Sequence, residues 1–300
     1  MPSLKSIRKR ITSTKATQKI TRAMKMVAGA RLTRAQQRIT QMRPYAIKTG
    51  EVLQSVAASM TSAAEQGVSG DDIHPLLAKR PEKKVVFLVL AGDRGLCGAF
   101  NTNVNKAATA AWQEKQAAGV EVEFASIGKK AREFLNRRRA NLVQDFVGIY
   151  DGLDLDKARK VTSWLVPRFE RGEIDAIYVV YNEFKSAITQ KTNVERLLPL
   201  EDKPAAKADG GVAPTEFLYE PNQRALLERL VPMYVEISVF RALLESQASF
   251  FGAQMTAMDA ATRNAKEMIA RLTLSYNRAR QAAITKELME IIGGAEALKS

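Results

Sequence analysis

The sequence predicts a long antiparallel coiled coil, formed by the two ends of the chain, with an open α/β domain inserted between them. Near both termini, apolar residues alternate spacings of three and four over stretches too long to pack against a small domain. Between these stretches, apolar β-branched runs alternate with helical segments. We assign residues 1–60 and 215–300 to a discontinuous coiled-coil shaft and residues 61–214 to an α/β foot domain.

The N-terminal stretch predicts one helix from about residue 3 to about residue 59. Ser3 can cap its start, and Pro44 is expected to bend it. At about 1.5 Å per residue such a helix is roughly 85 Å long, so it needs a long partner. The seam that would face this partner consists of Leu4, Ile7, Ile11, Leu32, Ala35, Ile39, Met42, Ala46, Thr49, Leu53, Val56 and Met60.

The seam changes character between Ile11 and Leu32. Apolar residues shift there to a displaced stripe, while polar residues take the projected seam positions. We interpret the change as a stutter that alters the supercoil locally. The projected seam holds Thr14, Gln18, Thr21 and Lys25, and the displaced stripe holds Ile20, Met24 and Val27.

The C-terminal stretch predicts a second long helix, from Asn222 to about Ala295, with a kink or restart at Pro232. Two terminal helices of similar period, joined by a folded middle, predict antiparallel pairing. Frequent alanines on both seams allow the helices to approach closely. The predicted seam consists of Leu230, Tyr234, Ile237, Phe240, Leu244, Ala248, Phe251, Met255, Met258, Ala265, Met268, Leu272, Tyr276, Ala279 and Ala283.

The middle of the chain predicts a Rossmann-like open sheet. The run 85–90 is continuously apolar, which is typical of a parallel strand buried on both faces. Further strands are expected at 120–127, 142–147, 174–181 and within 186–198, and helices at about 102–118, 128–137 and 154–171. Residues 61–83 and 199–214 are expected to be polar connectors.

Positive charge is concentrated at the N-terminus. Residues 1–50 contain thirteen Lys and Arg and no carboxylate, and the remaining 33 basic residues are balanced by 32 acidic ones. This asymmetry indicates an acidic partner: nucleic acid, an anionic membrane or an acidic protein surface. A cleaved transit peptide would share the composition but not a periodicity of this length. No apolar run approaches the roughly 18 residues of a membrane span.

The candidate chemical motifs are weak. The loop 92–98 follows the first strand, where α/β folds bind phosphate, but it does not have the spacing G-x-G-x-x-G. Gly128-Lys129 has no upstream glycine that would make it a P-loop. Cys97 and His74 are the only residues of their types and cannot build a zinc site. We therefore expect a tight structural turn at 92–98, and no catalytic, cofactor-binding or metal-binding residues.

Three segments together resemble the gamma subunits of F-type rotary ATP synthases, and the resemblance covers essentially the whole chain. The first is the N-terminal helix, in residues 6–11 (SIRKRI) and 17–28 (TQKITRAMKMVA). The second is the strand–loop–helix turn 93–101 (DRGLCGAFN). The third is the C-terminal helix, in residues 276–288 (YNRARQAAITKEL) and 293–295 (GGA).

The resemblance implies a non-catalytic central-stalk rotor. In this family the coiled coil stands inside a ring of alpha and beta subunits, and the foot sits with the epsilon subunit on the membrane ring of c subunits. Proton flow turns the shaft, which drives the catalytic sites of the head through different affinities. No nucleic acid is implied as a partner. The implied location is peripheral, on the cytoplasmic face of a bacterial plasma membrane or the matrix face of a mitochondrial one.

The resemblance also implies contact residues. Met24 and Lys25 match where the N-terminal helix faces an acidic lever loop of a beta subunit, and Gln281 and Thr285 match where the C-terminal helix touches the catch loops of the ring. The stretch 249–255 (SFFGAQM) departs from the family's Ser-Glu-x-x-x-Arg-Met pattern, because Phe250 replaces the glutamate and Gln254 the arginine. This departure predicts a more apolar contact at Gln254 and a phenylalanine ring directed into the seam or the surrounding ring.

Two alternatives remain from the residues alone. A coiled-coil protein that binds nucleic acid would use the thirteen N-terminal charges on phosphates. An α/β nucleotide-binding enzyme with helical arms would use the loop 92–98. DNA binding distinguishes the first and nucleotide titration the second.

Overall fold

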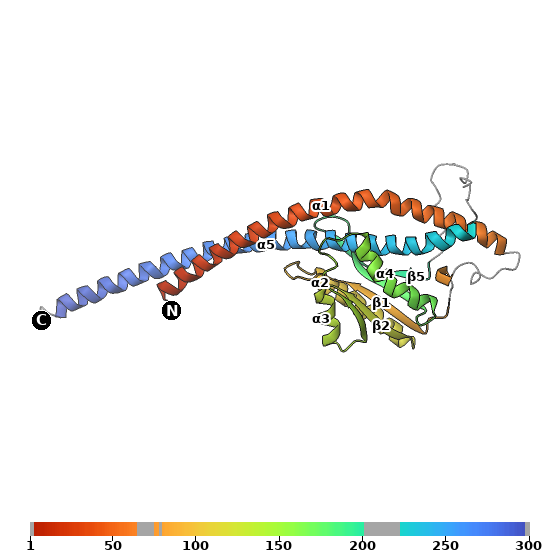
Figure 1. The fold of residues 1–300 in the computed structure, drawn as a ribbon. Helices are drawn as coiled ribbons and strands as arrows, with labels where there is room; N and C mark the ends of the chain where they lie inside the picture. Colours follow the sequence, from red (N-terminus) through yellow and green to blue (C-terminus); the bar gives the residue numbers. More distant parts are fainter. Residues whose placement is uncertain (1–2, 65–74, 78–79, 201–222, 298–300) are drawn as a thin grey trace. The chain divides into compact units, whose positions relative to one another are not determined.

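The chain begins and ends with a very long helix, and the sequence between these two helices forms a five-stranded sheet domain (Figure 1). A computed structural model describes residues 3–64, 75–77, 80–200 and 223–297, so His74 and residues 201–214 of the predicted connector lie outside the described part. The elements are α1 (Leu4–Ala64), η2 (Pro75–Leu77), β1 (Lys84–Leu90), α2 (Phe100–Ala117), β2 (Glu121–Ile127), α3 (Lys129–Arg137), β3 (Leu142–Phe146), α4 (Leu155–Glu170), β4 (Ala176–Phe184), β5 (Gln190–Leu198) and α5 (Gln223–Ala297).

The predicted fold class is confirmed, with two corrections to the helices. α1 ends at Ala64 and not near residue 59, and it contains Pro44 as the sequence predicted. α5 runs through Pro232 without restarting. The start of α1 behaves as expected, because the Ser6 amide donates to Ser3 Oγ at 3.3 Å.

Two compact units make up the chain. The first, which we call the coiled-coil unit, combines Met1–Gly29 with Gln254–Ser300. The second, which we call the sheet unit, is Ala30–Ala253. Each unit therefore contains a part of α1 and a part of α5.

In the coiled-coil unit α1 and α5 run antiparallel. Thr14 Oγ1 lies 4.0 Å from Met268 Sδ, and Lys25 Nζ lies 2.6 Å from Asp259 Oδ1. A methyl group added at Gly29 would lie 3.6 Å from Met255 Sδ. The less exposed positions of α1 continue the heptad without interruption: Ile7, Ile11, Thr14, Gln18, Thr21, Lys25 and Ala28.

The predicted stutter between Ile11 and Leu32 is therefore wrong. The polar residues occupy the seam, and Ile20 and Val27 of the displaced stripe are 60% and 53% exposed. Only Met24 of that stripe is partly covered. The heptad is preserved because α5 places its own polar residues, Asp259 and Thr262, opposite those of α1.

The sheet unit contains one twisted sheet with strand order β3-β2-β1-β4-β5. The four strands β3, β2, β1 and β4 are parallel, and β5 runs antiparallel to β4. Only the turn 185–189 separates β4 from β5, which is too short for the crossover that a parallel pair requires. The remaining strands are joined by helices, as the alternating pattern predicts.

Both faces of the sheet are covered. α2 and α3 pack on the face that carries Phe87 and Phe124, together with Trp112 and Leu135. On the opposite face lie α4 and α5 (Figure 1). Residues 85–90 are consequently no more than 1% exposed, which explains why the sequence of β1 is continuously apolar.

Candidate functional site

The loop after β1 is held closed by its own residues. Asn101 Oδ1 accepts from the Gly92 amide at 2.8 Å. The Asn101 amide group donates to Arg94 O at 3.2 Å and lies 3.1 Å from Cys97 Sγ. One side chain at the start of α2 thus ties together three points of the loop, as expected for a tight structural turn.

The N-terminus of α3 is also occupied from within the chain. The Lys129 amide donates to Asp93 Oδ1 at 3.0 Å, and the Lys130 amide donates to Gly92 O at 3.1 Å. Gly128, at φ 89°, allows this approach, because a Cβ there would lie 2.1 Å from Ala91 O. The Asp93 carboxylate therefore takes the position in which a helix N-terminus of this fold would bind a phosphate.

The carboxyl end of β1 is covered by α5. A Cβ at Gly92 would lie 2.8 Å from the Phe250 ring, and that ring packs edge-on against Phe100 at 5.6 Å between centroids. The crevice between β1 and β4, at which open α/β sheets bind nucleotides, is thus lined by a phenylalanine where a ligand would need polar groups. This packing supports the structural interpretation of the loop 92–98.

Cys97 lies in the same cluster and is buried. Burial raises the pKa of its thiol above the ordinary value. A thiol in this state is a weak nucleophile, because the thiolate is the reactive form. Its surroundings give Cys97 a packing role.

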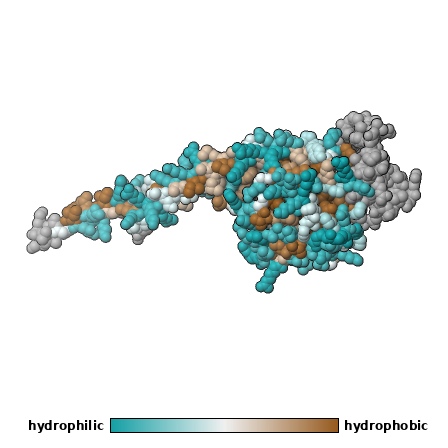
Figure 2. All heavy atoms as spheres, in the orientation of Figure 1, coloured by the Kyte–Doolittle hydropathy of each residue, from teal (hydrophilic) through white to brown (hydrophobic). Residues whose placement is uncertain are grey.

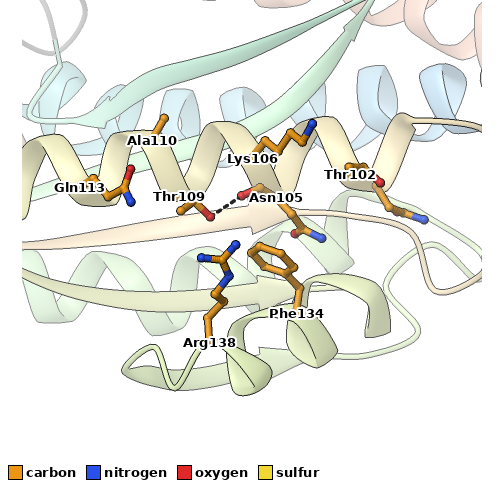
Figure 3. A pocket seen from close by; sticks show the side chains of 9 residues that line it. Thr102, Asn105, Lys106, Thr109, Ala110, Gln113, Phe134 and Arg138 are labelled. Atoms are coloured by element: carbon orange, nitrogen blue, oxygen red, sulfur yellow. Dashed lines mark hydrogen bonds between the residues drawn. The ribbon is translucent and has the colours of Figure 1, made fainter.

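A shallow groove of about 350 Å³ lies between α2 and α3 (Figure 3). The Arg138 guanidinium reaches from α3 toward Thr109 on α2, and Asn105 points toward the Phe134 ring. The residues that line the groove include no carboxylate, histidine or cysteine. They are Asn101, Thr102, Asn105, Lys106, Thr109, Ala110, Gln113, Phe134 and Arg138.

Metal and membrane chemistry find no support in the described residues. Across 3–64, 75–77, 80–200 and 223–297, no three His, Cys, Asp or Glu side chains gather as metal ligands. Within the same ranges, no helix combines the length and the apolar character that a membrane span requires.

The basic N-terminal segment presents its charge outward. Of its thirteen Lys and Arg, eleven are exposed, and only Lys25 and Arg38 are partly covered. This agrees with heptad geometry, which leaves few positions for the seam. Arg38 donates to the Leu153 carbonyl, and Lys25 pairs with Asp259. The hydrogen bond from Lys25 holds the pKa of the Asp259 carboxyl below its ordinary value.

The five contact residues taken from the resemblance lie in different environments of the coiled-coil unit. Gln281 and Thr285 are exposed on α5. Met24 and Gln254 are partly covered. Lys25 is engaged with Asp259 at 2.6 Å. The pairing of Lys25 follows from tertiary contact between segments 234 residues apart, so local sequence patterns could not reveal it.

An exposed apolar surface at the end of α5 escaped the sequence reasoning. Ile284, Leu288, Met289, Ile291 and Ile292 are between 52% and 72% exposed. Figure 2 shows apolar side chains gathered toward this end of the helix. The signal was present in the sequence, because four apolar residues fall within 288–292. Contiguous exposed apolar surface of this kind marks an interaction site.

The two phenylalanines of the departing segment belong to the sheet unit, and both are partly buried. Phe250 packs on the loop after β1, a position that the sequence did not indicate. The Arg31 guanidinium of α1 lies 5.8 Å above the centroid of the Phe251 ring, so this ring contacts the partner helix.

Comparisons with known proteins agree along the whole chain. A family model described as ATP synthase matches residues 3–298. The chain is 57% identical to the ATP synthase gamma chain of Sorangium cellulosum and 48% identical to that of an Anaeromyxobacter species, with complete coverage of both proteins in each pair.

Solved structures share the fold. One is a chain from the central stalk and c-ring of the Tetrahymena thermophila mitochondrial ATP synthase, with a TM-score of 0.61 and 22% identity over 81% of this chain and 99% of that one. Another is from the rotor of the Euglena gracilis mitochondrial ATP synthase, with a TM-score of 0.60 and 18% identity over 94% and 98%.

Proposed function

This chain belongs to the ATP synthase family, among its gamma chains, and from that premise we propose that it is the central-stalk rotor of an F-type ATP synthase. It transmits rotation between a proton-driven membrane ring and a catalytic head of alpha and beta subunits. The observation that carries the proposal is the antiparallel pairing of the two chain ends in the coiled-coil unit, in a chain that matches gamma chains over its full length.

The two helices of the coiled-coil unit present different faces. The part of α1 up to Gly29 carries eight Lys and Arg and no carboxylate, whereas residues 254–297 of α5 carry six basic and five acidic residues. A rod that is basic on one side and nearly neutral on the other makes unequal contacts with the subunits around it. A partner changes a conformational equilibrium only when it interacts more strongly with one state than with another. Unequal contacts with the shaft can therefore hold the catalytic sites of the head in states of different nucleotide affinity.

The proposed head contacts use the exposed residues of this unit. On α1 the exposed apolar residues Ile20 and Val27 lie among the cations Lys19 and Arg22, and Met24 lies beside them. On α5 the residues are Gln254, Gln281, Thr285 and the exposed apolar end 284–292. The cations suit an acidic loop of a beta subunit, and the apolar end suits an apolar bearing surface.

The sheet with its helices α2, α3 and α4, within the sheet unit, supplies the foot in this proposal. We assign residues 61–214 to the part that sits with the epsilon subunit on the c-subunit ring, and residues 1–60 and 215–300 to the shaft. Membrane association is then indirect, through other subunits, on the cytoplasmic face of a bacterial plasma membrane.

The chain is proposed to be non-catalytic. The internally bonded loop 92–98, with Asp93 on the α3 amides and Phe250 on Gly92, supports this assignment. Nucleotide binding and phosphoryl transfer belong to the alpha and beta subunits. The purified chain should therefore hydrolyse no ATP above the buffer rate.

Rotation of a reconstituted complex tests the proposal. A cysteine in place of Glu114, exposed on α2, carries a bead, while the buried Cys97 does not compete for the label. The alpha–beta head with this chain should rotate the bead in one direction on ATP, and the head without the chain should leave surface-bound beads still. A head that hydrolyses ATP identically with and without the chain, with no bead rotation, would contradict the rotor function.

Charge reversal tests the proposed basic contact. Replacing Lys19, Arg22 and Lys25 together by Glu should lower proton-driven ATP synthesis in membrane vesicles several-fold and weaken attachment to the head at low salt. Replacing Lys25 alone by Ala should leave assembly intact. Unchanged synthesis in the triple variant would show that this basic face is only a solvated surface.

A further inference from the structure

The coiled-coil unit contains a polar belt in the middle of its helix–helix seam. The belt consists of Thr14, Gln18, Thr21 and Lys25 on α1 and Asp259 and Thr262 on α5. Two cross-helix contacts lie within it: Lys25 Nζ to Asp259 Oδ1 at 2.6 Å, and Thr21 Oγ1 to Thr262 Oγ1 at 2.8 Å. Thr21 is only 8% exposed, so its pairing is enclosed by the two helices.

We propose that the ion pair Lys25–Asp259, with the adjacent Thr21–Thr262 contact, fixes the register of α1 against α5. The pair is a positioning element of the rod. It acts by making every shifted alignment of the two helices electrostatically worse than the native one. The proposal depends only on coiled-coil geometry and goes beyond the rotor function.

The seam needs such an element because its apolar layers discriminate weakly. Ala28 on α1 and Ala265 on α5 are the buried apolar residues nearest the belt on each helix apart from Met258. The alanine layers offer similar packing to several alignments, and of the buried apolar residues beside the belt only Met258 carries a large side chain that a shift would displace. A single polar contact inside a coiled-coil seam is the established way to select one alignment over others.

The charges of α5 determine which alignment of the two helices is favoured. A shift by one heptad places Lys25 opposite Lys266 or Gly252, and a shift by half a heptad places it opposite Arg263 or Thr256. Asp259 is the only carboxylate between residues 246 and 266. Native alignment is therefore the one that gives Lys25 an opposite charge, whereas shifts in one direction set it against a like charge.

Exposure indicates that the pair acts through specificity more than through strength. The side chains of Lys25 and Asp259 are 40% and 36% exposed, and pairs this accessible to water add little stability. Arg263 also faces Asp259, at 3.5 Å, from one turn further along α5. The carboxylate thus lies between two cations, one from each helix; when α1 shifts it loses its contact with Lys25, while Arg263, on the same helix as Asp259, stays beside it.

The assignment changes what Lys25 contributes to a partner. Its ammonium group is bound to Asp259, whereas Lys19 and Arg22 are exposed on the same helix. Lys25 is then a positioning residue, and the outward cations are the ones available to an acidic surface. This consequence alone rests on the proposed function.

Disulfide trapping in the full chain measures the register directly. Thr14→Cys with Met268→Cys reports native alignment, since these side chains touch in the structure. Thr14→Cys with Ser275→Cys reports the alignment shifted by one heptad, in which residue 25 faces Lys266. The buried Cys97 stays in place, and the chain without added cysteines is the blank.

The decisive variant is Lys25→Asp, because it repels Asp259 and attracts Lys266. We expect at least a fivefold rise in the ratio of shifted to native cross-link. The swap Lys25→Asp with Asp259→Lys should return the ratio to the wild-type value. Lys19→Asp, the same charge change at an exposed position off the seam, should leave it unchanged.

A neutral variant covers the case in which Lys25→Asp fails to fold. Lys25→Gln with Asp259→Asn keeps polar side chains of similar size and removes both charges, so both cross-links should form. A ratio that stays at the wild-type value in both the reversed and the neutral variants, or a swap that does not restore it, would overturn the proposal.

Discussion

The same two helices face different surroundings in the two units of the chain. In the sheet unit five consecutive residues of α5, 242–246, are buried. In the coiled-coil unit only Ala265 is buried among residues 263–268. Within the part of the chain that the structure describes, α5 is enclosed on most sides where it packs against both α1 and the sheet, and on one stripe where it packs against α1 alone.

This difference determines what polar residues do in each unit. On the enclosed part of α5, Glu245 accepts from the Phe184 amide at 3.0 Å, and Ser249 donates to Asn182 O at 3.0 Å. These contacts attach the helix to the carboxyl end of β4. On the open part, Asp259 pairs across the seam with a residue of α1. Polar groups thus join helix to sheet in one unit and pair helix with helix in the other.

Truncation of a buried side chain should give the largest difference in stability loss between the two units. Phe87 in β1 is 1% exposed and stacks on Phe124 and Tyr178, so Phe87→Ala should lower the free energy of unfolding by about 3–5 kcal/mol. Ile11→Ala, at a partly exposed seam position, should lower it by about 1–2 kcal/mol, because less apolar area is lost. Urea unfolding followed by circular dichroism measures both. Equal losses would contradict the difference in burial.

The contact between α5 and β4 should give the next largest effect. Glu245 is 5% exposed, and Arg43 on α1 lies 3.5 Å from its carboxylate. Glu245→Ala leaves the Phe184 amide without its acceptor, so we expect a loss of about 1–3 kcal/mol in the free energy of unfolding. Glu267→Ala, at an exposed position of α5 in the coiled-coil unit, is the matched control and should change stability by less than about 0.5 kcal/mol. A neutral Glu245→Ala variant would show that this attachment is dispensable.

The smallest expected effect is a pH dependence confined to the coiled-coil unit. The hydrogen bond from Lys25 lowers the pKa of Asp259 below its ordinary value of 3.8. Because the folded pKa is the lower one, the stabilisation is complete above pH 3.8 and is lost as the pH falls through the folded pKa. Titration of the Asp259 carboxyl carbon by NMR should show this lowered pKa, and Lys25→Gln should raise it toward 3.8. An Asp259 pKa that Lys25→Gln does not change would show that the pair is absent in solution.

Local patterns predicted most elements of the sheet unit, because each strand or helix carries its own signal. The apolar run 85–90 indicated a strand covered on both faces, and β1 has that burial. Helix ends were less predictable: α1 extends past residue 59 to Ala64, and α5 continues through Pro232, where a restart was one of the two expectations. A proline removes one hydrogen bond, but tertiary packing along the rest of a long helix outweighs that local loss.

Some features of the candidate site could likewise be predicted from the sequence, and others could not. The outward direction of the N-terminal charges followed from the sequence, since a heptad seam has room for few of thirteen cations. Three contacts could not be predicted from the sequence: the partner of Lys25, the carboxylate that binds the α3 amides, and the ring that packs against Gly92. Each depends on a residue from a distant segment, namely Asp259, Asp93 and Phe250.

The sequence by itself determined that the two ends pair, which positions of α1 outside 14–25 form the seam and that the middle folds as an α/β sheet. Periodicity suffices for these features, because burial of one stripe or one face repeats at the period of the backbone. Only the tertiary structure decided that the polar residues at 14–25 keep the seam and that Ile20 and Val27 face outward. The reason is that a polar side chain can occupy a seam when its complement stands opposite, and the residue opposite Lys25 is Asp259, 234 positions away.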